Sequence, residues 1–121
     1  MSPEGYCVGG WGVRMSTLSM AKFGQFLLNR GIWNGEQLLS SSWVREMMSV
    51  QQKADKSRFY GFQMWMHDDV DGAFRADGAL GQYIIVAPKE DMVIAITQCN
   101  RGNGILERKI LNDCPNLKNV I

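Results

Sequence analysis

The sequence predicts an α+β protein in which an antiparallel β-sheet is flanked by helices. Apolar residues first recur at helical spacing in two segments between residues 17 and 50. Beyond residue 58 the pattern changes to β-branched and aromatic runs separated by turn residues, and helical spacing returns near residue 105. The expected order is two helices, three or four antiparallel strands and one helix, in a single domain over residues 1–121.

The first helix is expected over residues 17–30. Ser16 is a suitable N-cap, because its hydroxyl can accept a hydrogen bond from a free backbone amide two or three residues later. Gly31 stands where a left-handed residue commonly ends a helix. Between these two signals, five residues share one helical face: Met20, Phe23, Gly24, Leu27 and Leu28.

A tight hairpin and a second helix are expected next. Asn34-Gly35 is a strong hairpin signal, since both central residues of that turn need positive φ, and residues 32–33 and 37–38 would flank it. Residues 40–42 are three serines that offer another N-cap. The spacing of Trp43, Val44, Met47 and Met48 predicts a helix that ends near residue 50. The polar residues 51–58 are expected to form an exposed loop.

The remaining chain reads mainly as strands. Residues 59–66 predict one strand, residues 67–72 a turn, and residues 73–76 the start of a second strand. The apolar runs 82–87 and 92–98 are expected to pair as an antiparallel hairpin buried on both faces. A last helix is expected from residue 105, ending before Pro115.

Composition excludes several classes of protein. The chain has 121 residues, 45% hydrophobic and 21% charged, which is typical of a globular domain rather than a disordered one. A net charge of +1 gives no electrostatic reason to expect nucleic acid or an anionic membrane as partner. No apolar run approaches the roughly 20 residues that span a bilayer. The first five residues lack the pattern of a signal peptide.

The inventory of metal ligands is small, and no cofactor is expected. Cys7, Cys99, Cys114 and a single histidine cannot supply a zinc site of Cys pairs or a Cys/His cluster. A Cys99–Cys114 disulfide stays open. The acidic turn of His67, Asp68, Asp69 and Asp71 could hold calcium, but it lacks the twelve-residue loop with its terminal glutamate. A solvated turn is the favoured interpretation, and no metal site is expected.

Two further residue classes are interpreted as core. The eight methionines are typical of adaptable core filling rather than a soft-metal site. The tryptophans could stack on sugars, but most adjoin other apolar residues in predicted elements, which favours core packing. The four are Trp11, Trp33, Trp43 and Trp65.

Ser19 and Lys22 match Ser-x-x-Lys, a spacing at which a neutral amine could take the proton of a nucleophilic hydroxyl. Ser19 also stands three residues after Ser16, where capping partners occur. A helix-start role is favoured over a nucleophile. The glycine-spaced run 76–82 is more informative. Gly78 and Gly81 could let backbone amides face a developing oxyanion, or could form a bulge or tight turn entering a central strand.

Read together, seven segments resemble the serine β-lactamase-like family, which includes class C β-lactamases, penicillin-binding DD-peptidases and related esterases. The likeness covers about residues 3–100 and rests on the order and spacing of the segments. They are GGWGVRMS (9–16), MAKFGQ (20–25), WNG (33–35), SWV (42–44), YGFQMW (60–65), GALGQYIIVAP (78–88) and MVIAIT (92–97).

The resemblance implies a three-layer parent protein of which this chain is the C-terminal portion. The family's Ser-x-x-Lys and Tyr-x-Asn motifs, which carry the nucleophile and the base, would lie upstream of residue 1. The third motif usually offers Lys or His before a glycine. Here Arg75-Ala76-Asp77-Gly78-Ala79 supplies neither, and Ala79 stands where many relatives have His. The candidate oxyanion and substrate-side residues are Gly78, Ala79, Gly81 and Gln82.

These implications set the functional expectations. The chain is expected to be inactive by itself, with the N-terminal half of a bacterial, extracytoplasmic serine hydrolase as its missing partner. The parent would cleave an amide or ester bond. The alternative is a non-catalytic module for binding or assembly. Without the other half, apolar strand faces and a free sheet edge should drive association into homo-oligomers.

Overall fold

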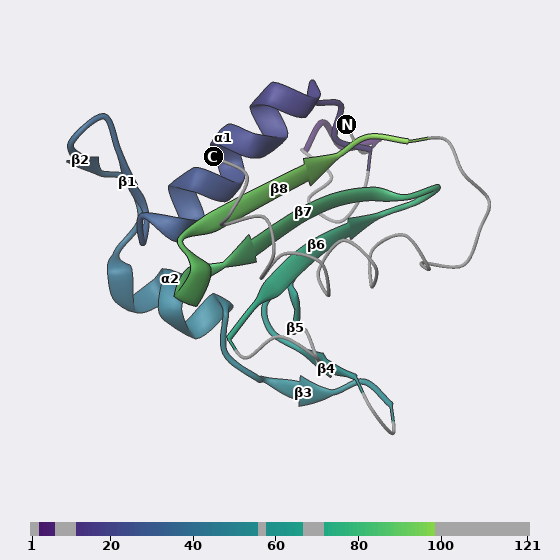
Figure 1. Ribbon diagram of the computed structural model, residues 1–121. Coiled ribbons are helices and arrows are strands. Elements are labelled where there is room, and N and C mark those ends of the chain that lie inside the picture. Colours follow the sequence, from purple (N-terminus) through teal and green to yellow (C-terminus); the bar gives the residue numbers. More distant parts are fainter. Residues whose placement is uncertain (1–2, 7–11, 56–57, 67–71, 99–121) are drawn as a thin grey trace, which may run out of the picture.

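The computed structural model describes residues 3–6, 12–55, 58–66 and 72–98. Within them the chain forms a six-stranded antiparallel sheet, a two-stranded ribbon, two α-helices and one 3-10 turn (Figure 1). The elements are α1 Thr17–Leu28, β1 Ile32–Trp33, β2 Glu36–Gln37, α2 Ser41–Met47, β3 Gln52–Lys53, β4 Phe59–Tyr60, β5 Trp65–Met66, β6 Phe74–Gly78, β7 Gln82–Ala87, η1 Pro88–Glu90 and β8 Met92–Ile96.

The sheet is a meander in which each strand pairs with the next along the chain, in the order β3-β4-β5-β6-β7-β8. The antiparallel hairpin expected from residues 82–87 and 92–98 is confirmed in its pairing, but its second strand ends at Ile96 and is not fully buried. Its register runs from Tyr83 opposite Ile96 to Ala87 opposite Met92. Every residue of β7 after Gln82 is buried, whereas β8 is partly buried throughout and forms one edge of the described sheet.

The first helix begins as expected but ends earlier. The Ser16 hydroxyl accepts from the Ser19 amide at 3.1 Å, which confirms the N-cap. The helix ends at Leu28 rather than residue 30, because Asn29 caps it and the next two residues leave helical geometry. Arg30 has φ 54° and Gly31 has φ 84°, so two left-handed residues turn the chain into β1.

The segment after α2 corrects one expectation. The Ser40 hydroxyl caps α2 by accepting from the Trp43 amide at 3.2 Å. The chain then joins the sheet at once, since the Gln51 amide donates to the Tyr60 carbonyl at 2.9 Å. The expectation of a loop over residues 51–58 was wrong in part, because Gln52–Lys53 forms β3. A two-residue exposed edge strand needs no apolar pattern, so the polar composition of this segment did not predict it.

The single strand expected over residues 59–66 was also wrong. It divides into β4 and β5, which fold back so that Tyr60 lies opposite Trp65. Gln63 turns the chain with φ 61°, and the Gly61 amide donates to the Met64 carbonyl at 2.7 Å. The ribbon of β1 and β2 is as expected, with positive φ at both residues of the Asn34-Gly35 turn.

The core lies mainly between the sheet and the helices. One buried cluster consists of Met20, Leu27, Val44, Met64, Phe74, Ile84 and Val86. A second contains Tyr83 and Ile85, which alternate with Ile84 and Val86 and so face the other side of β7. Met20 and Met64 are buried, in line with core filling. Core packing was the wrong expectation for Trp43, which is 47% exposed and stacks on Phe62 with ring centroids 5.5 Å apart.

Several predictions fall outside the described residues: the acidic turn, the three cysteines, Trp11 and the last helix. In the part of the chain that the structure describes, no three His, Cys, Asp or Glu side chains gather in a way that could hold a metal ion. None of the described helices is long and apolar enough to cross a membrane.

Candidate functional site

The glycine-spaced run forms the turn between β6 and β7. Gly78 pairs with Gln82, and the three residues between them close the hairpin. Leu80 has φ 66° and Gly81 has φ 90°, so two successive left-handed residues make the turn tight. The Gly81 amide donates to the Gly78 carbonyl at 3.3 Å. A tight turn entering an interior strand was one of the two readings of this run.

Gln98, the residue two positions after β8, holds this turn from the side. A β-carbon built on Gly81 would lie 2.1 Å from Gln98 Nε2 and 2.6 Å from its Cγ, so only glycine leaves room for that side chain. The Gln82 side-chain amide donates to the Gln98 backbone carbonyl. Both contacts join the start of β7 to the end of β8. The second one engages the Gln82 side-chain nitrogen in a hydrogen bond within the protein.

The start of α1 reaches the same end of the sheet. Thr17 Oγ1 and Thr97 Oγ1 lie 2.7 Å apart and link the first residue of the helix to the residue after β8. Figure 1 shows the start of α1, the end of β8 and the β6–β7 turn together at one end of the sheet. The candidate site is therefore a rim of hydroxyl and amide groups around the turn.

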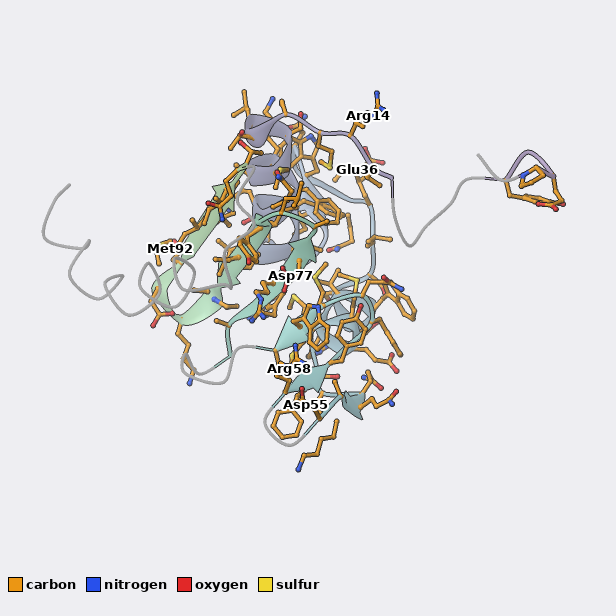
Figure 2. The ribbon with its side chains drawn as sticks, turned by 90° about the vertical axis from the view of Figure 1, so that its right-hand side faces the viewer. Arg14, Glu36, Asp55, Arg58, Asp77 and Met92 are labelled. Atoms are coloured by element: carbon orange, nitrogen blue, oxygen red, sulfur yellow. The ribbon has the colours of Figure 1, made fainter. Side chains whose placement is uncertain are left out.

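The charged pair nearest the turn lies on β6. Arg75 Nε and Asp77 Oδ2 are 3.3 Å apart, with side chains that are 14% and 29% exposed. Arg75 lies opposite Ile85, so the pair occupies the sheet face that turns away from the larger core cluster. Figure 2 shows Asp77 on β6, apart from the second described ion pair, Asp55–Arg58, on the β3–β4 hairpin.

Ser19 and Lys22 lie at the start of α1 and are both exposed. Ser19 Oγ is 2.9 Å from Ser16 Oγ, and the Ser19 amide donates to the same Ser16 hydroxyl. This pairing is that of a capped helix start, as expected from the sequence.

Of the residues around the turn, sequence reasoning identified Gly78, Ala79, Gly81 and Gln82 but missed Thr17, Thr97 and Gln98. Thr17 and Gln98 lie in none of the seven segments singled out above, and Thr97 entered only as the last residue of segment 92–97. The register of the hairpin is the observation that points to Thr97 and Gln98, because Tyr83 lies opposite Ile96 and Gln82 is therefore close to both residues. The turn, with the backbone amides of Ala79 and Leu80 at its tip, could bind a carbonyl oxygen.

Comparison with known proteins gives a structural relationship. No family model and no curated protein matches the chain, whereas 28 chains of solved structures do. One of these is a protein from Bacillus anthracis, provisionally assigned as a 6-aminohexanoate-dimer hydrolase. It is 31% identical over 83% of this chain, with a TM-score of 0.66. The match spans 27% of that protein's length. The architecture is thus α+β and of the β-lactamase-like kind.

Proposed function

We propose that this chain is the C-terminal part of a β-lactamase-like serine hydrolase that cleaves an amide or ester bond. In this proposal the β6–β7 turn borders the acyl-binding site, and a segment outside the chain supplies the nucleophile. The observation that supports it most is the tight turn at Gly78–Gln82, within a chain that is 31% identical to an assigned hydrolase. That neighbour's named substrate, a dimer of 6-aminohexanoate, is joined by an amide bond.

The chemistry assigned to this chain is electrostatic. A serine from the missing part would attack the substrate carbonyl, and negative charge would develop on the carbonyl oxygen. A preorganised backbone amide near Ala79 would stabilise that charge, an interaction worth about 10²–10³ in rate in serine hydrolases. Gln82 and Gln98 would keep the turn rigid. Gln82 was expected to orient substrate, but its amide nitrogen is engaged by Gln98, which favours a supporting role.

The partners and setting follow from the same proposal. The upstream part would carry Ser-x-x-Lys and Tyr-x-Asn, as in penicillin-binding and class C relatives, in a bacterial extracytoplasmic enzyme. The match to 27% of the neighbour leaves most of that protein without a counterpart in this chain. Without the upstream part of the parent protein, the chain would associate with further copies of itself.

The test begins with the gene. The DNA upstream of codon 1 should encode both missing motifs in the same reading frame, and the extended protein should hydrolyse a p-nitrophenyl ester or a chromogenic β-lactam. An upstream sequence without either motif would favour the non-catalytic module instead.

A pair of variants in the extended protein tests the turn itself. Ala79→Pro removes a backbone N–H and should lower kcat about 10²–10³-fold with little change in KM. Ala79→Gly keeps the amide and should retain activity within about tenfold. Equal activity of the two variants, with equal thermal stability, would remove the turn from the proposed site.

A further inference from the structure

We propose that Asn34 is a site of spontaneous covalent modification. The backbone nitrogen of Gly35 closes on the Asn34 side chain to form a succinimide, and water then opens this ring to aspartate or isoaspartate. The inference rests on the turn between β1 and β2. It is independent of the proposed function, because an inactive hydrolase would leave this site intact and an unmodified Asn34 would leave the hydrolase assignment intact.

The β1–β2 turn leaves both reacting groups unengaged. Trp33 pairs with Glu36, so Asn34 and Gly35 are the two residues of the turn, and both are exposed. Among the described residues, the Gly35 amide donates no hydrogen bond and the Asn34 side chain makes none. A β-carbon built on Gly35 would have no atom of a non-neighbouring residue within 4 Å. The amide is therefore free to react, and water has access to the turn.

Glycine at position 35 favours the ring closure because no β-carbon shields the attacking nitrogen. The turn itself selects this residue, since Asn34 has φ 50° and Gly35 has φ 83°. Both central residues of such a two-residue hairpin turn need positive φ, and Asn-Gly is the pair that adopts it most readily. The same dipeptide that closes the hairpin therefore brings the least hindered nucleophile next to a side-chain amide.

Asn29, at the end of α1, shows the opposite arrangement. The amide that follows it belongs to Arg30 and donates to the Leu27 carbonyl at 2.9 Å. The Asn29 Oδ1 atom accepts from Gln25 Nε2 at 3.1 Å. Ring closure at Asn29 would break both hydrogen bonds, a cost that is absent at Asn34. The structure therefore distinguishes two exposed asparagines by the bonding of their reacting groups.

The reaction needs water as its only co-reactant. A base removes the proton of the Gly35 amide, the nitrogen attacks Asn34 Cγ, and the Cγ–Nδ2 bond breaks as ammonia leaves with a proton. Hydrolysis of the ring at Cγ gives aspartate, and hydrolysis at the backbone carbonyl gives isoaspartate. One water is consumed and one ammonia is released, with no change of oxidation state. Either product carries a carboxylate, which takes the formal net charge from +1 to zero.

The isoaspartyl product would also alter the ribbon. Its backbone runs through Cγ, so the two-residue turn gains one backbone carbon. Turn length sets the register of a hairpin, and the pairing of Ile32–Trp33 with Glu36–Gln37 would be disturbed. Gln37 also donates from its side chain to the Arg30 carbonyl at 2.8 Å. The modification would thus loosen the ribbon where it adjoins the end of α1.

The test compares two Asn-Gly pairs within one chain. Arg30→Gly gives Asn29 the same following residue as Asn34, and position 30 has φ 54°, which suits glycine. The folded variant is incubated in mildly alkaline buffer, and peptide mass spectrometry follows the replacement of NH by oxygen at each asparagine. Asn34 should convert at least about tenfold faster than Asn29. In concentrated urea, where the hydrogen bonds are lost, the two rates should converge.

Circular dichroism reports whether the variant is folded, and the unsubstituted chain provides a test that needs no variant. Its Asn34 should convert in native buffer as well as in urea. An Asn34 that stays intact in the folded chain but converts in urea would overturn the proposal. Equal rates at Asn29 and Asn34 in the folded Arg30→Gly variant would overturn it too. Asn103-Gly104 repeats the dipeptide outside the described residues, and peptide mapping separates its signal.

Discussion

Gly81 has a left-handed backbone and a close neighbouring side chain. Any other residue at this position would suffer both backbone strain and a steric clash, and the two costs can be measured separately. Its φ of 90° disfavours a β-carbon by itself, and the Gln98 side chain occupies the space that the β-carbon would need. Gly35 has a similar φ of 83° but no atom within 4 Å of a built β-carbon. Comparing substitutions at the two glycines therefore separates the cost of the steric clash from the cost of the backbone strain.

We predict that Gly35→Ala lowers the free energy of unfolding by about 1 kcal/mol, the cost of a left-handed alanine. Gly81→Ala should cost about 1–3 kcal/mol more, because the added methyl group displaces Gln98. Adding Gln98→Ala removes the obstructing Cγ, Cδ and amide, so Gly81→Ala should then cost no more than Gly35→Ala. Urea unfolding of Gly35→Ala, Gly81→Ala, Gln98→Ala and the Gly81→Ala/Gln98→Ala double variant measures these differences. Equal costs of the two single glycine variants would contradict the described contact.

At the scale of elements, helix α1 depends on its cap. Ser16→Ala leaves the Ser19 amide without its acceptor and should reduce stability by about 1 kcal/mol. Ser16→Asp keeps an acceptor and adds a favourable charge at the helix N-terminus, so its stability should equal or exceed that of the parent. Thermal unfolding monitored at 222 nm compares them. An aspartate variant as unstable as the alanine variant would argue against this cap.

The contact between α1 and the sheet gives a second test. A β-carbon on Gly24 would lie 2.4 Å from Val93 Cγ1 and 3.0 Å from Ile84 Cγ2. Gly24→Ala raises helix propensity by about 1 kcal/mol, yet we expect a net loss of stability because the helix must move off β8. In a Val93→Ala background the same change should become neutral or stabilising. A double-mutant cycle by urea unfolding gives the coupling, which independent sites would lack.

Local signals in the sequence predicted most elements, and long-range pairing explains what they missed. Both N-caps, the Asn34-Gly35 turn and the β7–β8 hairpin followed from neighbours within a few residues. The β3 strand did not, because two exposed residues become a strand only through pairing with β4. Gln98 was missed for the same reason, since its contact with Gly81 spans the hairpin. The turn itself was identified, while its bonding partners depend on tertiary structure.

At the scale of the whole molecule, the described residues form a packed core, and the proposed site needs a nucleophile from another segment. The helices and the sheet enclose a cluster of buried apolar residues that includes Met20 and Val86. The described part of the chain therefore has a packed hydrophobic core. The turn at the end of the sheet presents backbone amides. Among the described residues, no nucleophilic or basic side chain is seen to hydrogen-bond to this turn. The proposed function, which follows the family resemblance, therefore assigns the catalytic serine to a segment outside the chain.

The most direct test of that assignment is the intact mass of the pure, folded chain after incubation with a fluorophosphonate, together with turnover of a p-nitrophenyl ester. Ser19 is engaged at the helix cap with Ser16, so we predict an unchanged mass and no turnover above buffer. A stoichiometric adduct mapped to Ser19, with turnover abolished in Ser19→Ala and preserved in Ser42→Ala, would contradict the account. The chain would then carry its own nucleophile.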